Sequence, residues 1–272
     1  IGSIDSTGSV NTDAGFSIMS YTGTGSVETF AHGLNSGAEL VILRNREVAS
    51  NWWVWGELLG NNQIMELDTT SAKYNPNGNY HNDTMPTSSV ISIGSDGQVS
   101  GNGQSHICYA FHSVQGYSKI GSYTGNGNAD GTFVYTGFKP AFVMIKKTDS
   151  AGNFWHIYDN KRSTSGSNVV DDVLYPNRSD AEYSEARLDF VSNGFKIRTT
   201  NGDINTSGGN YIFMCFAENP FTTSTGVPAT ARWFMKFMLL LSICSLTHTE
   251  CTTPMAYPIY FKDWNDCITE AY

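Results

Sequence analysis

One stretch of sequence occurs twice in this chain, and an internal repeat limits the possible folds more than any single motif does. Tyr21-Thr22-Gly23-Thr24-Gly25 returns 102 positions later as Tyr123-Thr124-Gly125-Asn126-Gly127. Four further segments recur at this offset or within three positions of it: residues 40–44 at 142–146, 51–53 at 153–155, 96–97 at 201–202, and 106–107 at 211–212. An offset this constant predicts two related units, with Trp53 equivalent to Trp155.

Each unit has the pattern of short strands. Brief apolar runs between polar turns are typical of buried strands. The runs are residues 38–44, 52–56, 90–93 and 106–111, and then 141–147, 154–158, 195–198 and 211–216. Asp96-Gly97 and Asn201-Gly202 predict hairpin turns, because Gly accepts the positive φ that such turns require. A helical period is suggested only at residues 179–186.

These patterns predict an all-β chain of two tandem β-sandwich, jelly-roll-like units, related by a repeat of about 100 residues. We expect residues 1–16 to be a connector that continues from an upstream part, since Ile1 is not an initiator Met. The first unit is then residues 17–115 and the second is residues 116–221. Residues 222–272 form a linker and an atypical tail.

Charge and hydropathy exclude several classes of protein. The chain has 16 Lys and Arg against 25 Asp and Glu, a net charge of −9. Its basic clusters, Lys146-Lys147 and Lys161-Arg162, carry too little positive charge to bind a nucleic-acid backbone. The apolar run 237–243 is far shorter than the roughly 20 residues of a membrane span. We therefore expect neither nucleic-acid binding nor membrane insertion.

Five cysteines are present, an odd number without any Cys-x-x-Cys, so neither a disulfide scaffold nor a zinc module is indicated. Cys108 aligns with Phe213 and Cys215 aligns with Ala110. Both cysteines are therefore expected to be core residues, and no disulfide is expected between them.

The tail begins with an internal Met235-Lys236 and an apolar run, which resemble the start of a secretory leader. Two interpretations stay open. Either two reading frames have been joined after Arg232, or the tail is a strand or helix that covers the second unit.

No constellation for catalysis is apparent, so we expect no catalytic residue, no metal site and no cofactor. The six histidines lack metal-ligand spacing. The acidic pairs Asp171-Asp172 and Glu182/Glu185 are interpreted as a solvated face. Residues 201–205 alternate oxygen side chains as calcium loops do, but turn chemistry explains them better.

Aromatic residues are the remaining candidates for a site. Trp53 and Trp55 share one face of a strand, with Trp52 on the other, and core packing is the main alternative role.

Residues 68–88 form a long polar loop, which residues 171–185 replace in the second unit. Tyr rings stack on sugars and Asn amides bond to hydroxyls. The candidate receptor-binding residues are Tyr74, Asn77, Tyr80, His81 and Trp55. A solvated loop without a partner is the alternative.

Five segments carry a family resemblance: residues 123–127, 137–146, 158–162, 192–196 and 216–221. Together they resemble a tandem repeat in tail-fibre and other virion structural proteins of tailed bacteriophages, especially marine ones, over roughly residues 17–221. The sequence after Arg232 departs from this pattern. The resemblance implies an external appendage of a virion, outside the cell, that binds a host surface glycan or protein. It implies a homotrimer in contact with other virion proteins, and no catalytic residues.

Two other functions are weighed against this one. The first is a carbohydrate-binding module or adhesin on a cell surface, or secreted from the cell. The second is a polysaccharide depolymerase, which needs two carboxylates that face one cleft. We expect no enzymatic activity.

Overall fold

The computed structural model describes residues 1–163 and 168–220, and these residues are all-β, with two one-turn helices. All of them belong to one compact unit. For description, we call residues 1–115 the first half and residues 116–220 the second half. No described helix is long and apolar enough to span a membrane.

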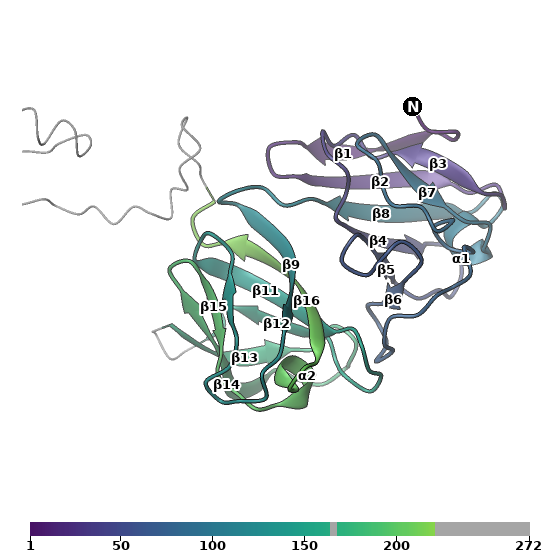
Figure 1. Ribbon diagram of the computed structural model, residues 1–272. Coiled ribbons are helices and arrows are strands. Elements are labelled where there is room, and N and C mark those ends of the chain that lie inside the picture. Colours follow the sequence, from purple (N-terminus) through teal and green to yellow (C-terminus); the bar gives the residue numbers. More distant parts are fainter. Residues whose placement is uncertain (164–167, 221–272) are drawn as a thin grey trace, which may run out of the picture. The chain divides into compact units, whose positions relative to one another are not determined.

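The first half has two layers (Figure 1). A six-stranded sheet has the order β1-β2-β8-β4-β5-β6, and a separate pair joins β3 to β7. The bounds are β1 (Ser6–Asn11), β2 (Phe16–Thr22), β3 (Glu28–Ala31), β4 (Leu40–Asn45), β5 (Trp53–Trp55), β6 (Met65–Glu66), β7 (Val90–Ile93) and β8 (Ser105–Phe111). Phe30, Ile91 and Ile93 from the pair share a core with Val41 and Leu43 from the large sheet. This half is therefore a small sandwich, as expected.

The second half differs from a sandwich. One eight-stranded sheet, in the order β10-β15-β14-β13-β12-β11-β16-β9, curls into a nearly closed, barrel-like form. The bounds are β9 (Ser118–Thr124), β10 (Phe133–Tyr135), β11 (Pro140–Lys147), β12 (His156–Asp159), β13 (Val169–Leu174), β14 (Tyr183–Val191), β15 (Gly194–Ile197) and β16 (Asn210–Ala217). The strands β13 and β14 lie between β12 and β15 in this order. They connect the two parts of the sheet that would form separate layers in a sandwich.

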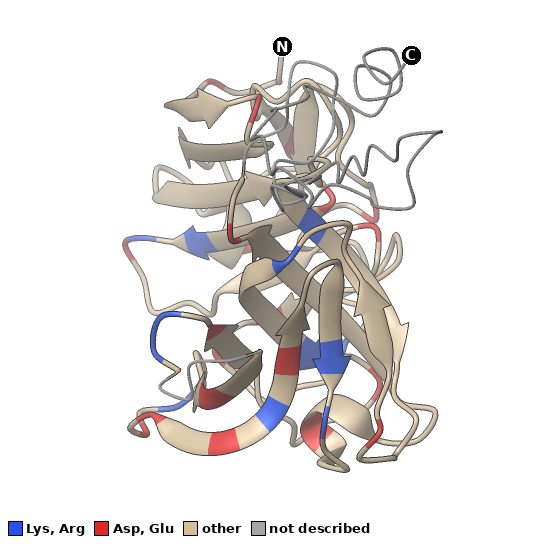
Figure 2. Ribbon diagram, turned by 90° about the vertical axis from the view of Figure 1, so that its left-hand side faces the viewer, with Lys and Arg blue, Asp and Glu red and all other residues tan. Residues whose placement is uncertain are grey.

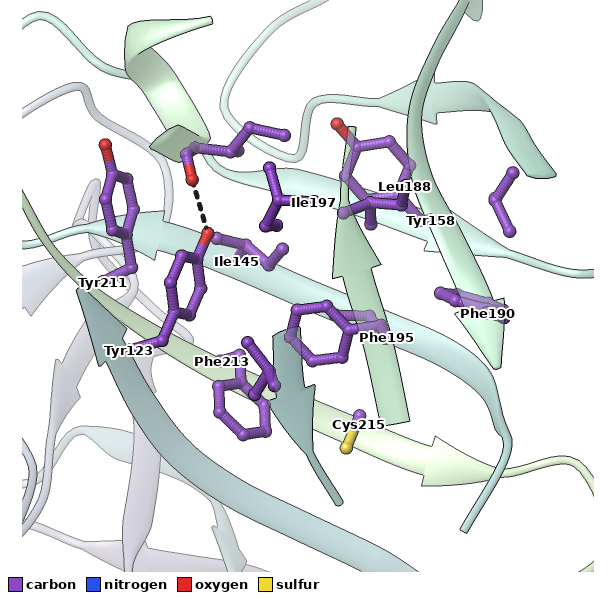
Figure 3. Close-up of a cluster of buried hydrophobic side chains, with 14 of the residues drawn as sticks. Tyr123, Ile145, Tyr158, Leu188, Phe190, Phe195, Ile197, Tyr211, Phe213 and Cys215 are labelled. Atoms are coloured by element: carbon purple, nitrogen blue, oxygen red, sulfur yellow. Dashed lines mark hydrogen bonds between the residues drawn. The ribbon is translucent and has the colours of Figure 1, made fainter. Parts of the chain in front are cut away.

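The core of the second half lies inside that curved sheet. The rings of Tyr123, Phe195, Tyr211 and Phe213 pack side by side there (Figure 3). Tyr123 and Tyr211 stack with ring centroids 4.8 Å apart. In the first half, Tyr21 and His106 stack in the same way at 5.0 Å.

A third apolar cluster joins the two halves through the outer faces of their sheets. Its members include Ile42, Val54 and Met65 from the first half and Met144 and Trp155 from the second. Polar bonds accompany this contact. Trp155 Nε1 donates to the main-chain oxygen of Glu66 at 2.8 Å. Because Trp155 is almost fully buried, this bond holds the halves together away from water.

Two one-turn helices occur where the sequence predicts hairpin turns. They are α1 (Gly97–Ser100) and α2 (Gly202–Asn205), and each is N-capped by the preceding side chain, Asp96 or Asn201. The hairpin expectation was wrong because Asp and Asn are also strong N-cap residues, and their oxygens here accept from a helical N–H.

A tyrosine from a neighbouring strand holds each short helix in place. The Tyr21 hydroxyl donates to Val99 O at 2.5 Å, and the Tyr123 hydroxyl donates to Ile204 O at 2.7 Å. The glycines that follow these tyrosines lie against the helices. Their small size is needed, because a Cβ on Gly23 would lie 2.6 Å from a main-chain atom of Ser100.

The other expectations about secondary structure have mixed outcomes. The eight apolar runs each overlap a strand, and residues 90–93 match β7 in full. The helix suggested at residues 179–186 is wrong, because β14 begins at Tyr183 and pairs with β13 and β15. Residues 6–11 of the expected connector form β1, the edge strand of the first sheet. The linker, the tail and three of the cysteines lie outside the described residues.

Both described cysteines are free and buried, in agreement with the sequence-based expectation. Cys108 lies in the core of the first half and Cys215 in that of the second. Burial raises the pKa of both thiols, so almost no thiolate is present at neutral pH. We therefore expect both to resist iodoacetamide in the folded protein and to react in urea. Peptide mapping by mass spectrometry tests this, and rapid native labelling of either residue would contradict it.

Charged residues are sparse along the ribbon (Figure 2). Several of them form exposed or half-exposed pairs of opposite sign in the second half, such as Arg162 with Glu182 and Arg198 with Asp189. Pairs of this kind contribute about 0–1 kcal/mol each. The fold therefore depends on its apolar and aromatic contacts.

Candidate functional site

The loop at residues 68–88 begins at a buried carboxylate. Glu66, at the end of β6, is only 5 % exposed. One of its oxygens accepts from the Tyr74 hydroxyl at 2.7 Å, and the other accepts from Thr69 Oγ1 at 2.7 Å. The Tyr74 main chain also exchanges two hydrogen bonds with Ile64. The Tyr74 ring is thereby fixed at both ends, although 37 % of the residue remains exposed.

Two aromatic contacts hold the far side of the loop. The Tyr80 ring lies on Trp53 with centroids 4.3 Å apart, and its hydroxyl accepts from Gln98 Nε2 at 3.2 Å. His81 is fully buried beside Trp55, at 5.9 Å between centroids, and one ring nitrogen bonds to the main-chain oxygen of Asn61. Burial lowers the pKa of His81, so this histidine is neutral near pH 7.

Between these two anchors the chain makes a tight turn of polar residues. Asn75 Oδ1 accepts from Asn77 N at 2.6 Å, and Asn77 has a φ of +55°. Asn tolerates this left-handed conformation better than most residues do. Gly94 lies directly beneath, where a Cβ would be 2.0 Å from Asn79 O. The turn is therefore clamped against β7, and Asn75, Asn77 and Asn79 remain exposed.

The ionisation of the loop tyrosines follows from these surroundings. Burial raises the pKa of Tyr80 to about 12, with smaller contributions from Asp96 and Glu66. Burial and the bond to Glu66 raise the pKa of Tyr74 as well. Both phenols therefore remain neutral at physiological pH. A neutral ring beside several amides suits recognition of an uncharged, hydroxyl-rich ligand.

The structure separates the five predicted site residues into two groups. Tyr74 and Asn77 are exposed, and Tyr80 is half-buried. Trp55 and His81 are completely buried and cannot reach a ligand, so we remove both from the candidate surface. Trp53 and Trp55 do share a face, and that face is the core. Trp52 on the opposite face is half-buried under the Arg44 guanidinium, 5.1 Å from its ring.

Glu66 is the site residue that sequence reasoning missed. Its role depends on a two-residue strand that pairs with β5, and no pattern in the sequence predicts so short an element. A single Glu in an apolar segment was the only available signal.

The acidic pairs lie on β13 and β14 or just before β14. Glu182 accepts from Arg162 at 2.6 Å, and Glu185 accepts from Arg187 at 2.5 Å. Asp172 is buried, while Asp171 bonds to Ser163. Within the described residues, no group of three His, Cys, Asp or Glu side chains is arranged to hold a metal ion. Asp203 of the calcium-like segment lies 3.5 Å from His156 instead.

A buried lysine near His156 has a consequence for stability. Lys146 is fully buried and donates to the main-chain oxygen of Asn153. Burial lowers the pKa of Lys146 to about 8, although Asp203 and Glu66 oppose the shift. In the unfolded chain the pKa of a lysine is about 10.4. Between about pH 8 and pH 10.4, the folded protein has therefore released the Lys146 proton while the unfolded chain still holds it.

We therefore expect stability to rise with pH in this window because of Lys146. The free energy of unfolding of the natural protein, minus that of a Lys146→Met variant, should increase between pH 7.5 and 9.5. Urea titrations at both pH values measure this difference. A difference that stays constant or falls would contradict the account.

Comparisons with known proteins place the chain in a family. Searches of the curated proteins and of the solved structures found no match. A family model described as "Domain of unknown function (DUF7483)" matches residues 1–220, which include both halves. The match covers most of the chain, and the chain therefore belongs to the DUF7483 family of domains of unknown function.

Proposed function

We propose that this chain is a structural part of an external appendage of a tailed-phage virion, and that its loop at residues 68–88 binds a glycan on the host surface. The observation that carries the binding role is the exposed Tyr74 ring, fixed by Glu66 among exposed asparagines. A rigid ring loses little entropy on binding, which favours contact with a sugar face. The virion setting is supported by the family resemblance described from the sequence.

We propose further that the two halves are copies of one unit. Strand order supports this, since β2-β8-β4-β5 in the first half corresponds to β9-β16-β11-β12 in the second. Main-chain bonds agree as well. Gly23 N donates to Gln104 O in the first half, and Gly125 N donates to Gly209 O in the second. The two donors are 102 positions apart and the two acceptors are 105 positions apart, as in the sequence repeat.

The pairing register corrects one detail of this repeat. Leu43 lies opposite Trp53, whereas Ile145 lies opposite His156, because the second turn is one residue longer. The equivalent of Trp155 is therefore Trp52 and not Trp53. Matching bonds support this assignment: Trp52 N donates to Asp68 Oδ1 and Trp155 N donates to Asn177 Oδ1, both at 3.1 Å.

A homotrimer that contacts other virion proteins completes the proposal. A single shallow loop binds a sugar weakly, and three linked copies would raise the avidity without new contacts. Sedimentation equilibrium of the purified chain tests this point.

The binding role is tested with an array of bacterial surface glycans. Tyr74→Ala removes the exposed ring, so we expect at least a tenfold loss of binding. Tyr183→Ala is the matched control, because Tyr183 is 53 % exposed on β14 and lies outside the loop. The loop is not the glycan-binding site if both variants lose the same amount of binding. The same conclusion follows if Tyr74→Ala keeps its fold and loses no binding.

The same loop would also serve a carbohydrate-binding module or adhesin on a cell surface. Detection of the protein in purified phage particles, by mass spectrometry or by labelled antibody, distinguishes the two settings. A depolymerase is disfavoured because Glu182 and Glu185 are each paired with an arginine.

A further inference from the structure

The barrel-like sheet of the second half differs at its two ends. At one end lies α2, and just after this helix Thr206 Oγ1 accepts from Lys147 Nζ at the end of β11. The other end, where β11 begins and β16 finishes, contains a cavity of about 220 Å³. The mouth of a β-barrel is a common place for a small-molecule site.

The cavity has an apolar inner side and a polar rim. Val170 and Phe190 line it from the barrel core, and both are almost fully buried. Lys139, Asn160 and Glu218 line it from three separate segments, which are the start of β11, the end of β12 and the end of β16. Pockets for drug-sized ligands measure about 300–1,000 Å³, so this smaller cavity suits a ligand with a single ring.

The three polar side chains form one fixed group. Lys139 Nζ lies 3.2 Å from Glu218 Oε2, and Asn160 Nδ2 donates to Glu218 Oε1 at 2.8 Å. Main-chain bonds fix the same segments, because Glu218 N donates to Lys139 O at 2.9 Å and Asn160 N donates to Ala141 O at 3.0 Å. A ligand would therefore meet a preorganised site, which lowers the entropic cost of binding.

This group keeps hydrogen-bonding capacity for a ligand. An ammonium has three N–H donors and a carboxylate oxygen has two lone pairs, and the contacts between Lys139, Asn160 and Glu218 use only some of them. Lys161 also lines the cavity, is exposed, and makes no ion pair with any residue in the ranges 1–163 and 168–220. Hydroxyl groups can bond to Lys139 and Glu218, whereas an anionic group is needed to pair with Lys161.

We propose that this cavity binds one acidic sugar residue, such as a uronic acid. Its carboxylate would pair with Lys161, and its hydroxyls would accept from Lys139 and donate to Glu218. The apolar face of the sugar ring would lie toward Val170 and Phe190. A neutral sugar leaves Lys161 unpaired and a simple carboxylate leaves Glu218 without a new donor, so neither uses the whole site. The inference does not depend on the loop at residues 68–88.

The experiment is a nuclear magnetic resonance titration of the full, ¹⁵N-labelled chain with glucuronate, glucose or acetate. We expect glucuronate to cause saturable shifts in the signals of residues 138–140, 160–163 and 217–219. Glucose lacks the carboxylate and acetate lacks the hydroxyls, so each should bind at least tenfold more weakly. Added salt should weaken the binding of glucuronate more than that of glucose, because salt screens the charge on Lys161.

The source of the sugar is distinguished by a further ligand, an oligosaccharide that ends in glucuronate. If the cavity takes the end of a glycan, this ligand binds at least as tightly as the free sugar. If the cavity takes the free sugar acid, the oligosaccharide binds more weakly. Both results are consistent with recognition of an acidic sugar.

A matched pair of lysine variants tests the role of the unpaired charge. Lys161→Gln should weaken glucuronate binding at least tenfold and leave the affinity for glucose unchanged. Lys119→Gln is the control, because Lys119 is also exposed, on β9, and does not line the cavity. Tyr74→Ala should leave glucuronate binding unchanged, which separates this site from the proposed glycan loop.

Four results would overturn the proposal. The first is no shift at tens of millimolar glucuronate. The second is an affinity for glucose or acetate equal to that for glucuronate. The third is an equal effect of Lys161→Gln and Lys119→Gln. The fourth is a set of shifts confined to residues 68–88, which would mean that the acidic sugar binds to the loop instead.

Discussion

Cys108→Phe should destabilise the protein by about 1–3 kcal/mol, and the addition of Met19→Gly should restore much of that loss. Cys108 lies directly opposite Met19 on adjacent strands, and both are buried. In the second half, Phe213 lies directly opposite Gly121, and its ring covers the glycine. In the first half the larger side chain, Met19, lies on β2, and the smaller one, Cys108, lies on β8. In the second half the ring of Phe213 lies on β16 and the glycine lies on β9. A ring at position 108 therefore needs a glycine at position 19.

A double-mutant cycle measures this coupling by urea unfolding. Met19→Gly alone should also destabilise the protein, because it leaves a cavity in the core. The two changes together should show an interaction energy of about 0.5–3 kcal/mol in the stabilising direction. Additive effects would contradict the equivalence of the two pairs, as would a Cys108→Phe variant as stable as the natural protein.

Trp155→Ala should cost about 3–5 kcal/mol, the range for removal of a large buried aromatic side chain. Trp155 is 2 % exposed in the apolar cluster between the halves, and its indole donates to Glu66 O. Glu66 in turn fixes Tyr74. This variant should therefore also disturb the candidate loop, and glycan binding should fall.

Two controls separate packing from hydrogen bonding. Trp155→Phe keeps most of the apolar contact but leaves Glu66 O without its donor, so a loss of about 1–3 kcal/mol is expected. Trp52→Ala, at the half-buried position that we propose as the equivalent one, should cost less than Trp155→Ala. If the Trp52 variant is the less stable one, the contact between the halves is not the source of the effect.

The strands were predictable where a short apolar run marked a buried segment, as at residues 90–93. Prediction failed where the signal was shared by two structures. Asp96 and Asn201 suit both a hairpin turn and a helix N-cap, and tertiary contact with Tyr21 and Tyr123 favours the helix. The barrel-like form of the second half was not predictable either, since it depends on β14, whose first residues are polar and exposed.

The candidate loop was found from its Tyr and Asn content, but the orientation of its side chains was not. A histidine and a tyrosine side by side in sequence, His81 and Tyr80, differ in burial because one fits beneath the loop against Trp55. Glu66 escaped notice because its importance arises from contacts across the loop and with Trp155. Such contacts depend on the fold and leave no local pattern in the sequence.

We propose residues 68–88 as the contact surface for a glycan. The most direct measurement is hydrogen exchange of the full chain with and without a saturating glycan selected on the array. The account predicts slower exchange at residues 74–83, with little change at residues 118–124 and 131–136. Slower exchange elsewhere in the chain and none in this loop would contradict it.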